Sequence, residues 1–126
     1  MKPNKKANEM TVKELAAYID YSVLKPEFTE EEIIALTKDG VELGCATICI
    51  NPGYMDLCEP IVKGSDTMLC PVCDFPFGTS STESKLKQIE INRRAEAKYL
   101  KILPMFSNFF IGLHHHLTLK NLCVAC

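Results

Sequence analysis

The stretch that decides the fold is Cys45-Ala46-Thr47-Ile48-Cys49-Ile50-Asn51-Pro52, which begins with a run that is apolar on both alternating faces. A strand of that kind is covered on both sides, as in a parallel sheet. Residues 67–73 form a second run of the same character, and residues 19–24 form a shorter one that ends at Lys25-Pro26. We therefore predict three strands that belong to one parallel sheet.

Helix signals separate these strands. Thr11-Val12-Lys13-Glu14 and Thr29-Glu30-Glu31-Glu32 are capping boxes, in which the Thr and Glu side chains each satisfy a free backbone amide. The second box opens the strongest helix of the chain, which is expected to stop at Gly44. Its apolar positions recur at helical spacing: Ile33, Leu36, Gly40 and Leu43.

Two more helices are expected further along the chain. One covers residues 54–63 and is weakened by Pro60, and the other begins at Ser81-Thr82-Glu83 and runs towards Tyr99. The alternation of helices and strands predicts βαβ units with right-handed crossovers. In such folds the functional site gathers at the carboxyl ends of the strands, here residues 20–25, 49–52 and 74–78, although Asp20 is expected nearer the middle of its strand.

Composition limits the classes of function. The chain has 126 residues, 47% of them hydrophobic and 24% charged, which suits one globular domain. A net charge of −2 gives no electrostatic case for binding nucleic acid or an anionic membrane. No run approaches the ~18 apolar residues of a membrane span. The seven cysteines follow no secretory signal, so we expect reduced thiols and a cytoplasmic location.

The strand segments, in this order and spacing, resemble the start of the deoxyribose-phosphate aldolase family. Residues 19–26 are similar to its Ile-Asp-His-Thr-Leu-Leu-Lys-Pro segment, with Tyr21 and Ser22 in place of His and Thr. Residues 46–52 and 69–78 are similar to its next two strands, and Ser81-Thr82-Glu83 to the helix start that follows. The resemblance covers roughly residues 11–90, about a third of a (β/α)₈ barrel of ~250 residues.

The resemblance implies an α/β fold: a partial TIM barrel of about three βα units, followed by an atypical tail. We predict a disordered segment over residues 1–10, a partial aldolase-type domain over 11–99 and a tail unlike the family over 100–126. After residue 90 the expected fourth-strand sequence is missing, and we hypothesise that a truncation or a reading-frame change replaced the rest of the barrel.

The family cleaves 2-deoxy-D-ribose 5-phosphate to glyceraldehyde 3-phosphate and acetaldehyde through a Schiff base on a lysine, and it uses no cofactor. The nucleophilic lysine, its partner lysine and a proton-transferring aspartate lie on later strands and have no counterpart here. We therefore predict that this chain alone is inactive. Another possibility is that the chain is one half of a split enzyme and needs a partner to supply the missing strands.

Two residues carry over from the family as pocket-supporting positions. Asp20 matches a first-strand aspartate that supports the lysine network, and Cys49 matches a second-strand cysteine close to the substrate. Both also fit purely structural roles, as a buried hydrogen-bonded carboxylate and a small core residue. Lys25 is expected to be an exposed turn residue rather than a nucleophile, and the glycine of residues 75–78 to shape a loop.

The alternative function is a small non-catalytic zinc-binding or interaction protein. Cys70 and Cys73, with Cys123 and Cys126, offer two Cys-x-x-Cys pairs, and four thiolates suit tetrahedral zinc. Against this, positions i and i+3 of a strand point to opposite faces, so we favour no metal site. His114-His115-His116 is interpreted as a solvated segment. An open sheet edge also predicts self-association.

Overall fold

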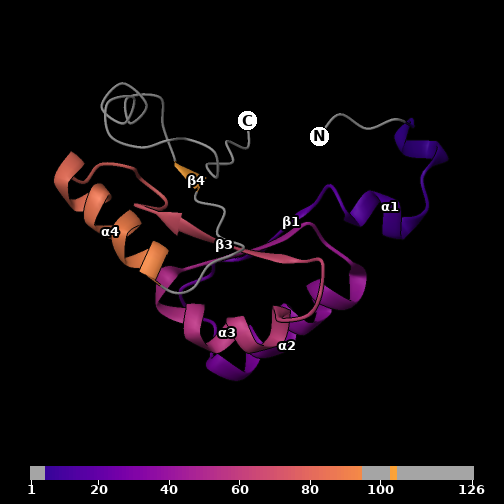
Figure 1. Cartoon of the computed structure of the whole chain (residues 1–126), viewed down its shortest axis with the longest axis horizontal. Coiled ribbons are helices and arrows are strands. Elements are labelled where there is room, and N and C mark those ends of the chain that lie inside the picture. Colours follow the sequence, from indigo (N-terminus) through magenta and orange to yellow (C-terminus); the bar gives the residue numbers. More distant parts are fainter. Residues whose placement is uncertain (1–4, 95–102, 105–126) are drawn as a thin grey trace.

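The molecule is built on one layer of parallel strands, with α-helices covering one of its faces (Figure 1). This computed structural model describes residues 5–94 and 103–104. The strands are β1 (Asp20–Val23), β2 (Thr47–Ile50), β3 (Met68–Cys73) and the two-residue β4 (Leu103–Pro104). They lie in the order β1-β2-β3-β4, and every neighbouring pair is parallel. The predicted parallel sheet is therefore confirmed, with strands slightly shorter than the sequence suggested.

The α-helices fall between the strands as predicted. They are α1 (Val12–Ala16), α2 (Glu30–Leu43), α3 (Met55–Val62) and α4 (Thr82–Arg94), and two short 3₁₀ helices, η1 (Ala7–Glu9) and η2 (Pro52–Tyr54), accompany them. In Figure 1, α2 and α3 lie together beneath the sheet and α4 lies beside β3. The β-α-β order is that of an α/β fold, and the described strands form an open parallel sheet.

The capping boxes set the starts of α1 and α2. Thr11 accepts a hydrogen bond from the Glu14 amide while the Glu14 carboxylate accepts one from the Thr11 amide, and Thr29 and Glu32 repeat the arrangement. At the other end of α2, Gly44 has φ of 76°, the left-handed conformation that glycine adopts without a steric penalty. The structure confirms both helix starts and this stop, which were predicted from the local sequence alone.

The segment before α1 has local structure from residue 5 onward. It contains η1, and Lys5 Nζ lies 2.5 Å from the Glu14 carboxylate in the first turn of α1. The hydrogen bond to Lys5 and those to Thr11 lower the pKa of Glu14 to about 2. Residues 1–4 lie outside the described part, so a disordered segment over 1–10 stays a prediction, as do the domain limits at 99 and 100.

The core lies between the sheet and the α2–α3 pair. Alternate side chains of the strands point to this side, since successive residues of a strand face opposite ways. The buried members of this cluster are Val23, Ile33, Ile48, Ile50, Met55, Cys58, Val62 and Leu69. Of the helical positions expected to face the core, Ile33 and Gly40 are buried, whereas Leu43, the last residue of α2, is 42% exposed.

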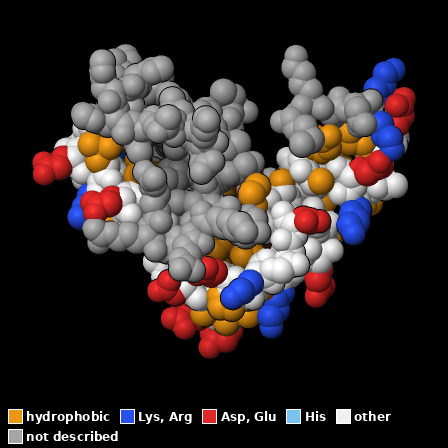
Figure 2. Space-filling view, viewed as in Figure 1, with side chains coloured by type: hydrophobic (Ala, Val, Ile, Leu, Met, Phe, Trp, Pro, Cys, Tyr) orange, Lys and Arg blue, Asp and Glu red, His pale blue; other side chains and the backbone are white. Residues whose placement is uncertain are grey.

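The surface carries mixed charges. Figure 2 shows Asp and Glu side chains with Lys side chains between them along the lower edge, where α2 and α3 lie. Such mixing agrees with the small net charge of the whole chain. Within residues 5–94 no helix has the length and hydrophobicity required to cross a membrane.

Candidate functional site

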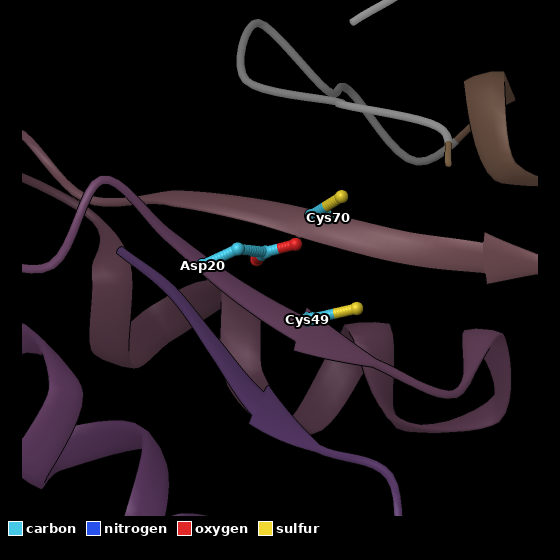
Figure 3. A group of neighbouring side chains, drawn as sticks. All are labelled: Asp20, Cys49 and Cys70. Carbon is cyan, nitrogen blue, oxygen red and sulfur yellow. The ribbon is translucent and has the colours of Figure 1, made fainter. Parts of the chain in front are cut away.

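Three side chains capable of binding a cation or hydrogen-bonding a substrate meet on the sheet: Asp20, Cys49 and Cys70. A carboxylate oxygen of Asp20 and the two sulfur atoms all lie within 4.8 Å of one another. Figure 3 shows the three side chains projecting from the face of the sheet that is opposite the helices. Each comes from a different strand, so only the folded sheet brings them together.

Strand register explains the meeting. Cys49 of β2 pairs with Cys70 of β3, and neighbouring paired residues point to the same face. Asp20 pairs with Thr47, two residues before Cys49, and therefore lies on that same face. The Thr47 hydroxyl donates a hydrogen bond to Asp20 Oδ1, which fixes the carboxylate. Cys49 and Cys70 are 3% and 1% exposed, whereas Asp20 is only partly buried.

Asp20 lies lower in the sheet than the carboxyl-end rule suggested. Asp20 was expected nearer the middle of its strand than the carboxyl end, and it is in fact the first residue of β1. The Asp20 side chain extends far enough to bring its carboxylate level with Cys49 (Figure 3). The site is therefore in the body of the sheet face, below the loops at its edge.

A hydrogen bond from a side chain to the backbone links the carboxyl ends of β1 and β2. Asn51 donates from Nδ2 to the carbonyl oxygen of Leu24, at 3.4 Å. Lys25, just beyond, is exposed, and its Nζ lies 5.6 Å from the centre of the Phe28 ring. The exposed environment agrees with the expected turn lysine and not with a buried nucleophile, whose ammonium group would need neighbours that favour its neutral form.

The loop after β3 is fastened by Asp74. This residue has φ of 55°, and its carboxylate accepts hydrogen bonds from the Ser80 amide (2.8 Å) and the Ser80 hydroxyl (2.5 Å). Lys85 of α4 donates to the Gly78 carbonyl oxygen at 2.6 Å and lies 3.5 Å from Asp74 Oδ2. Gly78, with φ of 64°, completes the loop, as the sequence predicted. The roles of Asp74 and Lys85 are not visible in the sequence, which gives only a loop and a helix start.

The Asp74 contacts predict a stability that depends on pH. Hydrogen bonds from Ser80, and the nearby Lys85, hold the pKa of Asp74 below its ordinary 3.8. A carboxyl group with a lowered folded-state pKa stabilises the fold fully above its unfolded pKa, and this contribution is lost as pH falls through the folded value. We expect Asp74→Asn, which tolerates the left-handed backbone, to lower the melting temperature at neutral pH. The difference in melting temperature between the variant and the parent should narrow when thermal unfolding is followed below about pH 4. A gap of constant size would contradict this assignment.

The two cysteines of the predicted Cys-x-x-Cys pair on β3 point away from each other. Cys70 joins Asp20 and Cys49, whereas the Cys73 thiol faces α4 and lies 3.7 Å from the Lys85 carbonyl oxygen. Burial, followed by the nearby Asp74 carboxylate, raises the pKa of Cys73. A knuckle needs both sulfurs on one side, so the geometry does not support the four-thiolate zinc site; Cys123 and Cys126 lie outside the described residues.

Tyr21, which stands where the family segment has a histidine, has a local structural role. Tyr21 points to the helix side of the sheet, where its hydroxyl donates a 2.9 Å hydrogen bond to Asp39 of α2. That bond, and then partial burial, raise the pKa of Tyr21. Gly40, one residue further along α2, leaves room for the ring. Tyr21 therefore fastens β1 to α2 and does not reach the Asp20 face.

Comparison with known proteins points to one family. No family model matches the chain. A deoxyribose-phosphate aldolase of Clostridium kluyveri is 45% identical over 76 residues, which are 60% of this chain and 35% of that protein. The enzyme of the same name from Treponema denticola is 43% identical over 75 residues, again 60% of this chain and 35% of the relative. The chain thus spans about a third of the length of the relatives it matches.

Solved structures agree. A putative deoxyribose-phosphate aldolase from Coccidioides immitis superposes with a TM-score of 0.67 at 26% identity, over 75% of this chain and 37% of that one. The tetrameric aldolase from Aeropyrum pernix superposes with a TM-score of 0.65 at 28% identity, over 75% of this chain and 40% of that one. The fold is accordingly the first part of an aldolase-type α/β barrel.

Proposed function

We propose that the N-terminal part of this chain belongs to the deoxyribose-phosphate aldolase family, which it resembles in sequence and fold, and that it supplies the first three βα units and the pocket floor of such an enzyme. The observation that carries the proposal is the parallel β1-β2-β3 sheet, whose sequence and topology both match the aldolases. The substrate class proposed for the complete barrel is a phosphorylated sugar, 2-deoxy-D-ribose 5-phosphate.

Within that pocket, Asp20 and Cys49 are proposed as positioning residues. The Thr47 hydroxyl holds the Asp20 carboxylate, and Cys49 lies beside it on the same face. A fixed carboxylate there would hydrogen-bond or charge-stabilise a lysine brought by later strands of the barrel. Neither residue forms the Schiff base itself, since neither offers an amine.

The chain by itself is proposed to be inactive, and to be a lyase only by descent. The segment that matches the aldolases contains no counterpart of the Schiff-base lysine or of its partner, and Lys25 is exposed beside Phe28. The origin of this difference, by truncation or a reading-frame change, stays a hypothesis that the nucleotide sequence after codon 90 would test in all three frames. A cytoplasmic location also stays a prediction, drawn from the cysteine content.

Borohydride trapping tests the inactivity. We expect the 126-residue chain, incubated with deoxyribose 5-phosphate and sodium borohydride, to show no mass increase on any lysine by mass spectrometry. An intact relative, such as the Clostridium kluyveri aldolase, serves as the positive control under the same conditions. A trapped adduct on this chain would overturn the proposal, and Lys25→Ala would then show whether Lys25 carries it.

Self-association through the sheet edge is a further part of the proposal. Among the described strands none lies on the outer side of β1, so its backbone groups are available to another strand. A split half that recruits the missing strands would use the same edge. Sedimentation at micromolar concentration distinguishes these cases from a monodisperse monomer, which would contradict self-association.

A further inference from the structure

The face of the sheet that carries Asp20 differs sharply from the face beneath it. Towards the helices, β2 and β3 present the large apolar residues Ile48, Ile50 and Leu69. On the other face, the same stretches of β2 and β3, together with β1, present a carboxylate and two thiols. Apolar packing alone would not require the Asp20 carboxylate, so part of this second face carries side chains that can bind a ligand.

We propose that Asp20, Cys49 and Cys70 form a binding site for a soft divalent cation such as Zn²⁺. Thiolates favour Zn²⁺ and Co²⁺ over Mg²⁺ and Ca²⁺, and a carboxylate completes a mixed set. This site is distinct from the four-thiolate set of Cys70, Cys73, Cys123 and Cys126, and it does not rest on the proposed aldolase ancestry.

The distances suit a tetrahedral ion. Zinc binds sulfur at about 2.3 Å and carboxylate oxygen at about 2.0–2.2 Å, which places two ligands of one ion roughly 3.5–3.8 Å apart. The three ligand atoms already lie within 4.8 Å of one another. Side-chain rotations that close the remaining gap of roughly 1 Å leave the strands in place.

The surroundings support the ligands. The Thr47 hydroxyl donates to Asp20 Oδ1, the kind of outer contact that orients a metal-bound carboxylate and leaves its other oxygen for the ion. Asp20 is only partly buried and gives an ion a route from solvent, whereas both thiols are buried. Three protein ligands leave a fourth position for water or a small anion, as in zinc sites that are open to exchange.

Cobalt titration tests the site. The full chain is used with its other candidate ligands removed from the tail, under a non-thiol reductant, and Co²⁺ is added while the absorption spectrum is followed. The tail substitutions are His114→Asn, His115→Asn, His116→Asn, Cys123→Ser and Cys126→Ser. We expect one Co²⁺ per chain, with tetrahedral d–d bands and a thiolate-to-cobalt charge-transfer band. Cys49→Ala and Cys70→Ala should each weaken binding at least about tenfold and reduce that band.

Cys58→Ala is the matched control, because Cys58 is also a buried cysteine but lies on α3 and hydrogen-bonds Thr37 on the helix side. It should leave the cobalt spectrum unchanged. Asp20→Asn keeps an acceptor for Thr47, so we expect it to keep the fold while weakening Co²⁺ binding by about tenfold or more.

A second measurement needs no substitution in the sheet. Zn²⁺ should slow the alkylation of Cys49 and Cys70 by iodoacetamide, read for each peptide by mass spectrometry, and leave Cys58 unaffected. The proposal is overturned if the parent shows no thiolate band and no such protection, or if Cys49→Ala and Cys70→Ala both retain the parent spectrum and affinity.

Discussion

Replacement of Ile48 by alanine is expected to lower the free energy of unfolding by about 2–5 kcal/mol. Ile48 is the central residue of the core on β2 and has no exposed surface. Its Cδ1 reaches α2 at Gly40, so the lost methyl groups would leave a cavity between sheet and helix. That cavity cannot refill easily, because the pairing of β2 with β1 and β3 holds the backbone on both sides.

Urea denaturation followed by circular dichroism measures this loss. Ile91→Ala on α4 is the matched control, since it removes the same atoms from a side chain that is 54% exposed. Its effect should stay within about 0.5–1 kcal/mol. Equal effects of the two substitutions would show that Ile48 does not lie in the core described here.

Gly40→Val should destabilise the fold by about 1–3 kcal/mol. A Cβ at this position would collide with Ile48 Cδ1 and stand 3.2 Å from Tyr21 Cγ. Helix propensity gives valine only a small advantage over glycine, so overpacking decides the sign of the change in unfolding free energy. Because Tyr21 must move, its hydrogen bond to Asp39 should also weaken.

Gly53→Val provides the comparison at a position where no atom lies within 4 Å of the added Cβ. We expect its unfolding free energy to stay within about 0.5 kcal/mol of the parent. The same urea titration applies to both variants. If Gly40→Val proved as stable as Gly53→Val, the close contact of α2 with the sheet would be contradicted.

Local signals in the sequence were sufficient for the order of the elements. The Thr11 and Thr29 capping boxes, and the glycine at 44, act through bonds within a few residues, so their outcome does not depend on the rest of the chain. The doubly apolar runs predicted buried strands for the same reason, and β2 is buried along its whole length. Leu43, the last residue of α2, is exposed although it fits the helical spacing, because periodicity does not show which residues of a helix have a packing partner.

Sequence similarity gave the family and marked Asp20 and Cys49, but it did not place Cys70 beside them. The sequence offered Cys70 only as part of a zinc alternative with Cys73, and its meeting with Asp20 depends on the pairing of three strands. The network of Asp74, Ser80 and Lys85 was missed for a similar reason, because a loop and a helix meet there only in space.

The sequence by itself determined the starts of α1 and α2, the order of the elements along the chain and the resemblance to the aldolases, because these follow from neighbouring residues and from motifs kept in register. The tertiary structure alone decided which side chains share a face. A shift of one residue in the pairing of β2 with β3 would turn Cys70 away from Cys49, and no local pattern encodes that register.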